Sequence, residues 1–309
     1  MNTLTLLMAL MLGLLTVPGE ENSSLAKENG YVINLDRAEK LEKMTYSSLF
    51  SKAGIIVLED TDESLLGKVD KLEVCDNNLY VLEKGRGLFL FNKQGKFIKM
   101  IGRKGKGPGE YIDPDDISID RENKKIYVLD SQTQNVLKYS GNGTFESSFK
   151  LENKGTRSTF IQPFKNALYT NLYTFDKSGK RFLLSKVDVT NGKRISFQFE
   201  ASQYNKGWNE LFSTNQHTFI SGPTGNPKFM QIFMDTIFEI TPKGIKPYIT
   251  LQSKKLVTKE YLETLIAEND MSKSARVSKI CDRLMKSDKI YIMYLIIGKP
   301  LNIFISAIM

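Results

Sequence analysis

The sequence predicts an all-β protein built from repeated four-stranded antiparallel sheets, and two observations carry this prediction. The first is the stretch 101–145, in which three short apolar runs follow a glycine-rich loop and a fourth run opens at Phe145 after a Gly143 turn. Short apolar runs separated by turn residues are typical of strands in an antiparallel sheet. The three complete runs are Ile117–Ile119, Ile126–Leu129 and Val136–Tyr139.

The second observation is an internal repeat. Leu79–Glu83 reads LYVLE, and Ile126–Asp130 reads IYVLD 47 residues later. Both copies then reach a turn of the form aromatic-x-x-x-Gly-x-Phe, which begins at Phe91 in the first copy and at Tyr139 in the second. A period of about 45 to 50 residues with four strands per unit is typical of a β-propeller. A β-sandwich would not repeat at this period, and a helical solenoid would show a 3.6-residue periodicity.

The expected domain plan has three parts. Residues 1–22 form a signal peptide, residues 23–54 a lead-in segment, and residues 55–309 the propeller, with about four and a half blades present. We expect a six-bladed type whose C-terminal blades are incomplete, and a smaller ring is the alternative. The two final apolar runs flank Gly298-Lys299-Pro300, which favours a core hairpin over a membrane span.

The N-terminus carries an apolar run, residues 4–17, followed by Pro18-Gly19. Its length suits the apolar region of a secretory signal better than a membrane span, although no Lys or Arg precedes it. An apolar core segment or an uncleaved anchor is the alternative. We therefore expect an exported protein of the periplasm or cell surface, with no transmembrane span in the mature chain.

Two segments have helical features. Residues 36–50 combine Asp36 and Glu39 near the start with a modest apolar face. Residues 258–269 have Thr258 as an N-cap and an apolar stripe of Leu262, Leu265 and Ile266, which predicts one short helix inserted between blades.

Charge and composition exclude some functions. The chain has a formal net charge of +8, one histidine (His217) and two cysteines, Cys75 and Cys281. A single histidine excludes a multi-histidine metal site within one chain. The cysteines are expected as buried free thiols, with a disulfide as the alternative. The densest basic cluster, residues 93–106, is either a solvated edge or an anion-binding patch.

Several motifs together resemble a known family. The loop IGRKGKGPGEY at residues 101–111, with IYVLDS at residues 126–131, resembles the NHL-type repeat. Residues 31–300 are more closely similar to the six-bladed propeller proteins exported by Bacteroidetes-type bacteria. The resemblance implies a secreted or lipid-anchored propeller with no established activity. Residues 14–21 contain no lipobox cysteine, so lipid anchoring does not carry over.

The glycine-rich loop is interpreted as a structural crossover between blades. A phosphate-binding loop would need to lead into a helix N-terminus, whereas this loop leads into further strands. The acidic stretch that follows lacks the spacing of an EF-hand, so turn capping or ion pairing is favoured over calcium. The crossover residues are Gly105, Gly107, Pro108, Gly109 and Glu110.

The best candidates for ligand contact are aromatic residues near predicted loops. An aromatic platform on a propeller face can stack on a sugar or a peptide. Packing between blades is the structural alternative for the same side chains. The candidate platform comprises Tyr204, Trp208, Tyr111 and Tyr173.

These patterns favour an exported, non-enzymatic binding module for a glycan, a peptide or an envelope protein. The sequence contains no GxSxG elbow, and it predicts no catalytic residue, cofactor or metal ligand. The alternative is a polysaccharide lyase or hydrolase on the same scaffold. A nucleic-acid partner is not expected, because the export signal argues against it.

Overall fold

The computed structural model describes residues 8–9, 30–37, 54–174, 179–204, 206, 218–222, 225–254, 256–267, 284–286, 290–295 and 302–307. These residues form mostly β-strands, with two α-helices and one 3-10 turn, so the all-β prediction is confirmed. The chain divides into two compact units. The first comprises residues 1–19, 41–170 and 186–195, and the second comprises residues 20–40, 171–185 and 196–309.

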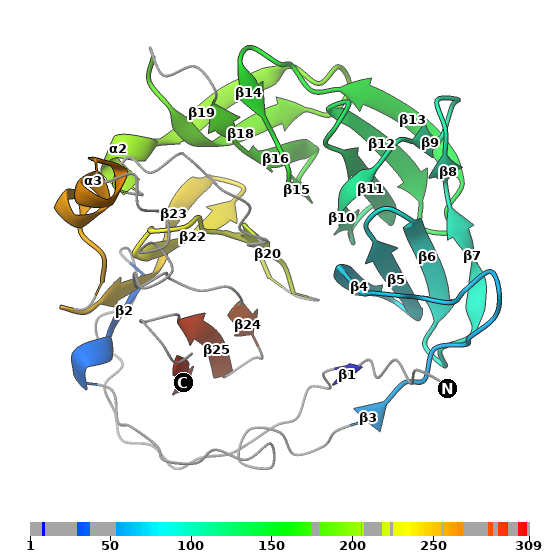
Figure 1. Cartoon of the computed structure of the whole chain (residues 1–309), viewed down its shortest axis with the longest axis horizontal. Helices are drawn as coiled ribbons and strands as arrows, with labels where there is room; N and C mark the ends of the chain where they lie inside the picture. The colour runs from blue at the N-terminus through cyan, green and yellow to red at the C-terminus, as the bar shows by residue number, and fades with distance from the viewer. Residues whose placement is uncertain are drawn as a thin grey trace. The chain divides into compact units, whose positions relative to one another are not determined.

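The first unit contains a four-stranded antiparallel sheet in the order β4-β5-β6-β7 (Figure 1). Its strands follow one another along the chain, so each is joined to the next by a short turn. The register shifts between Leu90 and Phe91, where β6 pairs with β7. The bounds are β4 (Lys71–Cys75), β5 (Asn78–Glu83), β6 (Gly87–Asn92) and β7 (Phe97–Ile101).

The second sheet of this unit repeats the first. Its order is β10-β11-β12-β13, and its register shifts between Lys138 and Tyr139 in the matching strand pair. The two copies of the sequence repeat are therefore two successive sheets of the same build. The bounds are β10 (Pro114–Asp120), β11 (Lys125–Asp130), β12 (Asn135–Ser140) and β13 (Phe145–Lys150).

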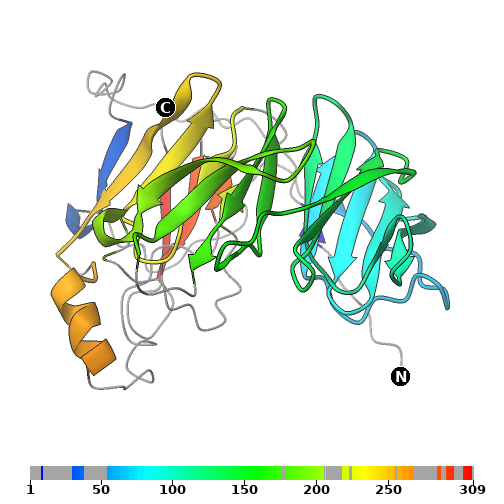
Figure 2. The same cartoon turned by 90° about the horizontal axis from the view of Figure 1, so that it is seen from above.

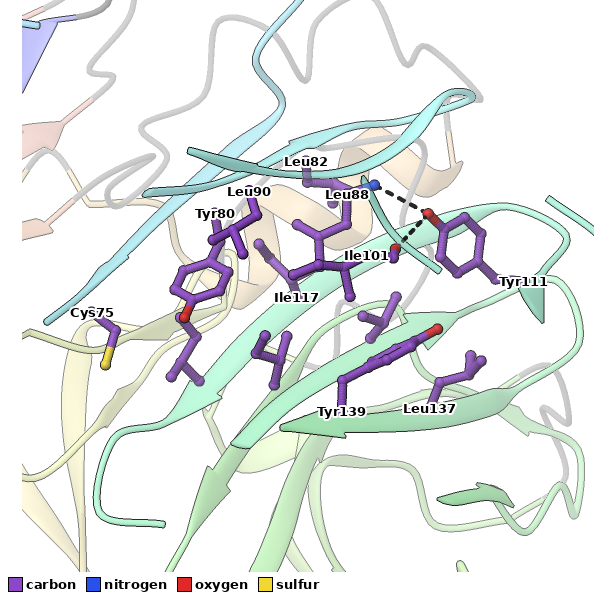
Figure 3. Close-up of a cluster of buried hydrophobic side chains, with 13 residues drawn as sticks. Cys75, Tyr80, Leu82, Leu88, Leu90, Ile101, Tyr111, Ile117, Leu137 and Tyr139 are labelled. Atoms are coloured by element: carbon purple, nitrogen blue, oxygen red, sulfur yellow. Dashed lines mark hydrogen bonds between the residues drawn. The ribbon is translucent and has the colours of Figure 1, made fainter. Parts of the chain in front are cut away.

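The inner strands of these sheets carry apolar side chains on both faces. Successive side chains of a strand point to opposite faces, so neighbouring apolar residues enter different clusters. In β5, Tyr80 and Leu82 point into the core cluster shown in Figure 3, whereas Leu79 and Val81 belong to a second cluster on the other face. A sheet covered on both faces needs unbroken apolar runs, which explains the LYVLE and IYVLD segments. The core cluster joins the two sheets, since Ile117 and Ile126 of the second sheet also contribute to it.

Three further sheets of the described fold have three or more strands, and three others are two-stranded (β1-β3, β8-β9 and β14-β17). Of the larger three, one is four-stranded in the order β15-β16-β18-β19, one is five-stranded in the order β2-β23-β22-β21-β20, and one is three-stranded in the order β24-β25-β26. The bounds are β15 (Ile161–Phe164), β16 (Ala167–Asn171), β18 (Phe182–Asp188), β19 (Arg194–Glu200), β20 (Phe219–Ile220), β21 (Lys228–Phe229), β22 (Thr236–Thr241), β23 (Gly244–Gln252), β24 (Leu284–Lys286), β25 (Ile290–Leu295) and β26 (Asn302–Ala307).

The described sheets give a propeller-like, blade-built fold, but they do not confirm six blades. Three sheets have four antiparallel strands, and the five-stranded sheet adds one parallel strand to four antiparallel ones, so the described residues hold four complete blade-type sheets. The predicted C-terminal hairpin is present as the antiparallel pair β25 and β26. The turn triplet at 298–300 lies outside the described residues.

The predicted lead-in segment supplies a strand to the second unit. Strand β2 (Tyr31–Asn34) pairs in parallel with β23, and Figure 2 shows it in blue beside the yellow strands. The Asp36 carboxylate accepts hydrogen bonds from Ser253 Oγ at 2.6 Å and from Lys254 N at 2.8 Å. Of the helix expected at residues 36–50, the structure describes only a 3-10 turn, η1 (Leu35–Arg37).

The remaining elements are short. Helix α3 (Lys259–Ala267) lies within the predicted range 258–269, and Thr258 Oγ1 accepts a hydrogen bond from Tyr261 N at 3.2 Å, as an N-cap does. The others are α2 (Ala201–Tyr204), the antiparallel pair β1 (Met8–Ala9) and β3 (Gly54–Ile55), and the strands β8 (Arg103–Lys104), β9 (Glu110–Tyr111), β14 (Thr156–Arg157) and β17 (Tyr173–Thr174).

Candidate functional site

A buried ion pair connects the first strands of neighbouring sheets in the first unit. Lys71 Nζ in β4 donates to Asp116 Oδ1 in β10 at 2.7 Å, and the Asp116 side chain is 1% exposed. The second carboxylate oxygen of Asp116 accepts a hydrogen bond from Ile161 N in β15 at 2.8 Å. One carboxylate therefore ties three first strands together.

A second charged pair lies further along the same two sheets. Arg121 Nη2, just after β10, is 3.1 Å from Glu73 Oε2 in β4. Burial raises the pKa of Glu73, although the positive charges of Lys71 and Arg121 oppose that shift. Burial alone would lower the pKa of Lys71, but the charges of Asp116 and Glu73 outweigh it and raise the pKa. We call Lys71, Glu73, Asp116 and Arg121 the inner charge cluster.

A β-bulge separates Asp115 from this buried cluster. Pro114 pairs with Asp130 and Asp116 pairs with Leu129, so Asp115 is left out of the strand register. Bulges redirect side chains, and here two adjacent aspartates reach different partners. Asp115 accepts a hydrogen bond from Ser131 Oγ and lies 3.7 Å from Lys84 Nζ.

Arg157 extends this arrangement onto the next segment of the same unit. Its Nη2 lies 3.5 Å from Ser131 Oγ, the same hydroxyl that donates to Asp115. In the described part of the chain, no carboxylate lies within 4.0 Å of the Arg157 guanidinium. We call Lys84, Asp115, Ser131 and Arg157 the loop-face string, in which charges alternate and the three charged side chains remain partly exposed.

The segment that carries Arg157 is held in place by its neighbour Ser158. The Gln134 side chain binds the Ser158 backbone twice, since Oε1 accepts from Ser158 N at 2.8 Å and Nε2 donates to Ser158 O at 2.9 Å. Gln134 has a φ of 57°, a left-handed conformation that a turn permits. The Arg194 guanidinium donates to Ser158 Oγ at 3.3 Å, and burial lowers the pKa of Arg194 to about 10. Arg157 is therefore presented from a fixed backbone.

The structure does not gather the predicted aromatic platform at one described place. Tyr111 is 1% exposed, and its hydroxyl accepts from Leu88 N at 3.2 Å and donates to Ile101 O at 3.0 Å (Figure 3). Tyr111 therefore offers no exposed ring. Tyr204, at the end of α2, makes an edge contact with Phe199 at 4.8 Å between ring centroids, and Tyr173 lies in β17. Trp208 and His217 lie outside the described residues.

The glycine-rich loop connects the outermost strand of the first sheet to the first strand of the second. Within it, Glu110 Oε2 accepts a hydrogen bond from Gly107 N at 2.8 Å, and β8 pairs in parallel with β9. A Cβ added at Gly105 would lie 2.0 Å from Glu110 Oε2, and one at Gly109 would lie 2.9 Å from the Phe145 ring. The loop thus wraps around the Glu110 carboxylate, and Pro108 occupies the turn before Gly109.

The acidic residues after this loop have separate partners. Asp113 Oδ1 accepts from Gly85 N at 3.1 Å, and both carboxylate oxygens of Asp120 bind Asn123 in a turn. The described residues contain no group of three or more His, Cys, Asp or Glu side chains placed to hold a metal ion. Cys75 is a buried free thiol, as predicted, and Cys281 lies outside the described residues.

Sequence reasoning missed the inner charge cluster and Arg157. The sequence KLEVC at Lys71–Cys75 contained a signal for the charge cluster. Lys71 and Glu73 are two positions apart in this strand, so they share the face that also carries the buried Cys75. Charges on a core-facing side need partners, so the pattern predicts a buried ion pair. It does not identify Asp116 as that partner.

Comparison with known families identifies the chain. Residues 30–307 match the model of the family "Domain of unknown function (DUF4934)", and the chain belongs to that family. No curated protein sequence matches it. The family assignment agrees with the predicted resemblance to propeller proteins in its extent along the chain, but it establishes neither an NHL-type repeat nor six blades.

One solved structure supports the fold. The chain is similar to a candidate exported protein from Bacteroides fragilis, with a TM-score of 0.63 and 19% identity over 81% of this chain and 71% of the other. A streptogramin B lyase gives 0.46 and 17%, over 84% and 73% of the two chains. At 19% identity the first likeness shows the fold alone, and the second score is too low to carry an argument. Among the described helices, none has the length and apolarity needed to cross a membrane.

Proposed function

We propose that the protein is an exported, non-enzymatic binding module that takes a glycan, a peptide or an envelope protein on the loop-face string. Arg157 carries the proposal, because it is a positioned guanidinium whose described partner is a hydroxyl rather than a carboxylate. A partner that supplies hydrogen-bond acceptors would complete the donor set of Arg157. Asp115 and Lys84 beside it offer an acceptor and a second donor.

Export and blade number belong to the same proposal. The apolar run at residues 4–17 supports an export signal, and a candidate exported protein shares the fold. A location in the periplasm or on the cell surface follows from export. A six-bladed propeller of the NHL type belongs to the proposal, with β24–β26 as part of a fifth blade.

Substitution at Arg157 tests the proposed site. Purified protein is applied to an array of bacterial surface glycans and peptides, and the Arg157→Gln and Asp115→Asn variants are compared with it. Loss of a charge-assisted hydrogen bond removes about 1.5–3 kcal/mol, so we expect binding at least about ten-fold weaker. Lys165→Gln, which removes an exposed cation paired with Glu122, is the control and should bind normally.

The aromatic platform provides the competing outcome. If Arg157→Gln binds as the wild type does while Tyr204→Ala does not, the ligand lies on the aromatic side chains near α2 instead. If the wild-type protein binds no glycan and no peptide on the array, the proposal is wrong for both of these ligand classes.

An enzymatic role has one observation in its favour. Glu73 is a buried carboxyl whose pKa burial raises, and it sits beside Lys71 and Arg121, an arrangement common among general acids and bases. Turnover of a polysaccharide that disappears in Glu73→Gln, while Glu122→Gln stays active, would establish a lyase or hydrolase and displace the binding-module proposal.

A further inference from the structure

A dense set of cations runs from the turn before the outermost strand of the first sheet into the crossover that follows it. Six basic residues fall within fourteen positions, from the turn before β7 to the glycine loop after β8. Five of the six are exposed, and Lys99 is partly buried. We call this set the basic edge: Lys93, Lys96, Lys99, Arg103, Lys104 and Lys106.

Only two of the six cations of the basic edge have an acidic partner among the described residues. Arg103 pairs with Glu110 at 2.6 Å, and Lys96 lies 3.6 Å from Glu59. Both carboxylates also bind backbone, since Phe97 N donates to Glu59 and Gly107 N donates to Glu110. Among the described residues, the other four cations have no acidic partner within the 4.0 Å limit of an ion pair.

The backbone that carries these cations is fixed by the fold. Strand β7 is the outermost strand of its sheet, and β8 is held by its parallel pairing with β9. Gly105 N donates to Tyr111 O at 3.1 Å, and Tyr139 Oη donates to Gly109 O at 3.0 Å. A partner would therefore meet cations on a backbone that is already ordered, which lowers the backbone part of the ordering cost of binding.

Protection of a sheet edge explains only part of the pattern. Lysines on an outer strand discourage pairing with a second chain, and Lys99 in β7 serves that purpose. Arg103, Lys104 and Lys106 lie beyond the end of β7 in the crossover, where they guard no edge of the four-stranded sheet. Their charge has no structural use in the described contacts apart from the pair of Arg103 with Glu110.

We propose that the basic edge binds an acidic polysaccharide. Lys96 precedes and Arg103 follows the five-residue strand β7, and an extended strand advances about 3.3 Å per residue, so the cations lie at both ends of this strand rather than at one point. A linear polymer with a carboxylate on each sugar can meet such a row at several places, whereas a single small anion meets one. This surface shares no residue with the loop-face string, so it is independent of the proposed function.

Polygalacturonate tests the proposal against its carboxyl-reduced, neutral counterpart. The wild-type protein should bind the acidic polymer, more weakly as salt rises, and should not bind the neutral one. The double variant Lys104→Gln/Lys106→Gln should lose affinity by about ten-fold, because two unpaired cations leave the array. Lys104→Arg/Lys106→Arg keeps the charge and should retain binding.

A matched double variant separates the site from general attraction to a basic protein. Lys124→Gln/Lys165→Gln removes the same charge at exposed positions elsewhere in the unit and should bind normally. Equal loss in that variant, equal binding of the neutral polymer, or binding of an oligonucleotide but not of polygalacturonate would each overturn the proposal. Arg157→Gln should leave this binding intact whether or not the loop-face proposal holds.

Discussion

Lys71 of β4 and Asp116 of β10 form a 2.7 Å ion pair between the first strands of two neighbouring sheets. Each strand belongs to a different copy of the sequence repeat, so the pair links two structural units rather than stabilising one. Because Asp116 also accepts from Ile161 N, its loss would leave that buried donor without an acceptor and would leave Lys71 with only the longer contact to Glu73, at 3.8 Å.

Removal of Asp116 should therefore be costly. Breaking a buried ion pair by deleting one partner typically costs about 3–5 kcal/mol, and we expect Asp116→Ala to fall in this range. The free energy of unfolding in urea measures the effect. Glu122→Ala removes the exposed partner of Lys165 and should change it by less than about 1 kcal/mol. A similar small change in Asp116→Ala would show that water reaches Lys71.

The same pair predicts a dependence on alkaline pH. The folded state raises the pKa of Lys71 above its usual value of 10.5, because Asp116 and Glu73 outweigh the effect of burial. Because the pKa of Lys71 is higher in the folded state, its charge contributes fully to the free energy of unfolding below pH 10.5. This contribution is lost as the pH rises through the pKa of the folded state. The free energy of unfolding in urea, measured between about pH 9 and pH 12, should fall more steeply with pH for the wild type than for Lys71→Met. Lys165→Met should keep the wild-type slope.

Gly102, at the start of the crossover, and Gly85, in the turn between β5 and β6, should differ in how they tolerate a side chain. Gly102 has a φ of 69°, and an added Cβ would lie 2.6 Å from both the Tyr111 ring and Tyr139 Oη. Gly85 has a φ of 82°, with nothing within 4 Å. Gly85→Ala should lower the free energy of unfolding by about 1–2 kcal/mol, the penalty for a residue with a Cβ at positive φ. Gly102→Ala should lower it further, because the added methyl group would also clash with two buried tyrosine side chains. Equal unfolding free energies would mean that the rings move aside.

Tyr111 should behave as a core residue. Tyr111→Phe leaves Leu88 N and Ile101 O without their buried partner, and each unsatisfied group costs about 1–3 kcal/mol. Thermal or urea unfolding should therefore show a clear loss of stability, with ligand binding unchanged. Tyr204→Phe is the control, since the described contacts of Tyr204 are ring contacts that a phenylalanine keeps. A loss of binding in Tyr111→Phe without loss of stability would return Tyr111 to the ligand platform.

Much of the fold could be predicted from local patterns. The repeat of LYVLE and IYVLD gives strands β5 and β11, and the Gly95 and Gly143 turns give the start of β7 and β13. Both glycines have positive φ, 83° and 80°, which is why a glycine recurs there. Helix α3 could be predicted from its N-cap and apolar stripe. Blade number could not, because the later sheets depart from the period.

The candidate site was largely hidden from sequence reasoning. Lys84, Asp115 and Arg157 are separated by 31 and 42 residues, and each is ordinary in its own turn or strand. Aromatic residues near predicted loops pointed to Tyr111 and Tyr204, but loop position in the sequence does not determine exposure. Tyr111 is buried because the crossover folds back over β6 and β7, where its hydroxyl finds two backbone partners.

The sequence by itself determined the period, the four-strand unit and the crossover that joins two units, because these depend on side-chain alternation and on backbone angles that only glycine adopts easily. Only the tertiary structure decided that Lys71 meets Asp116, that a bulge turns Asp115 toward Ser131, and that the lead-in strand β2 joins β23. Those contacts join residues far apart along the chain, and their energies depend on a desolvation that exists only once the sheets have packed.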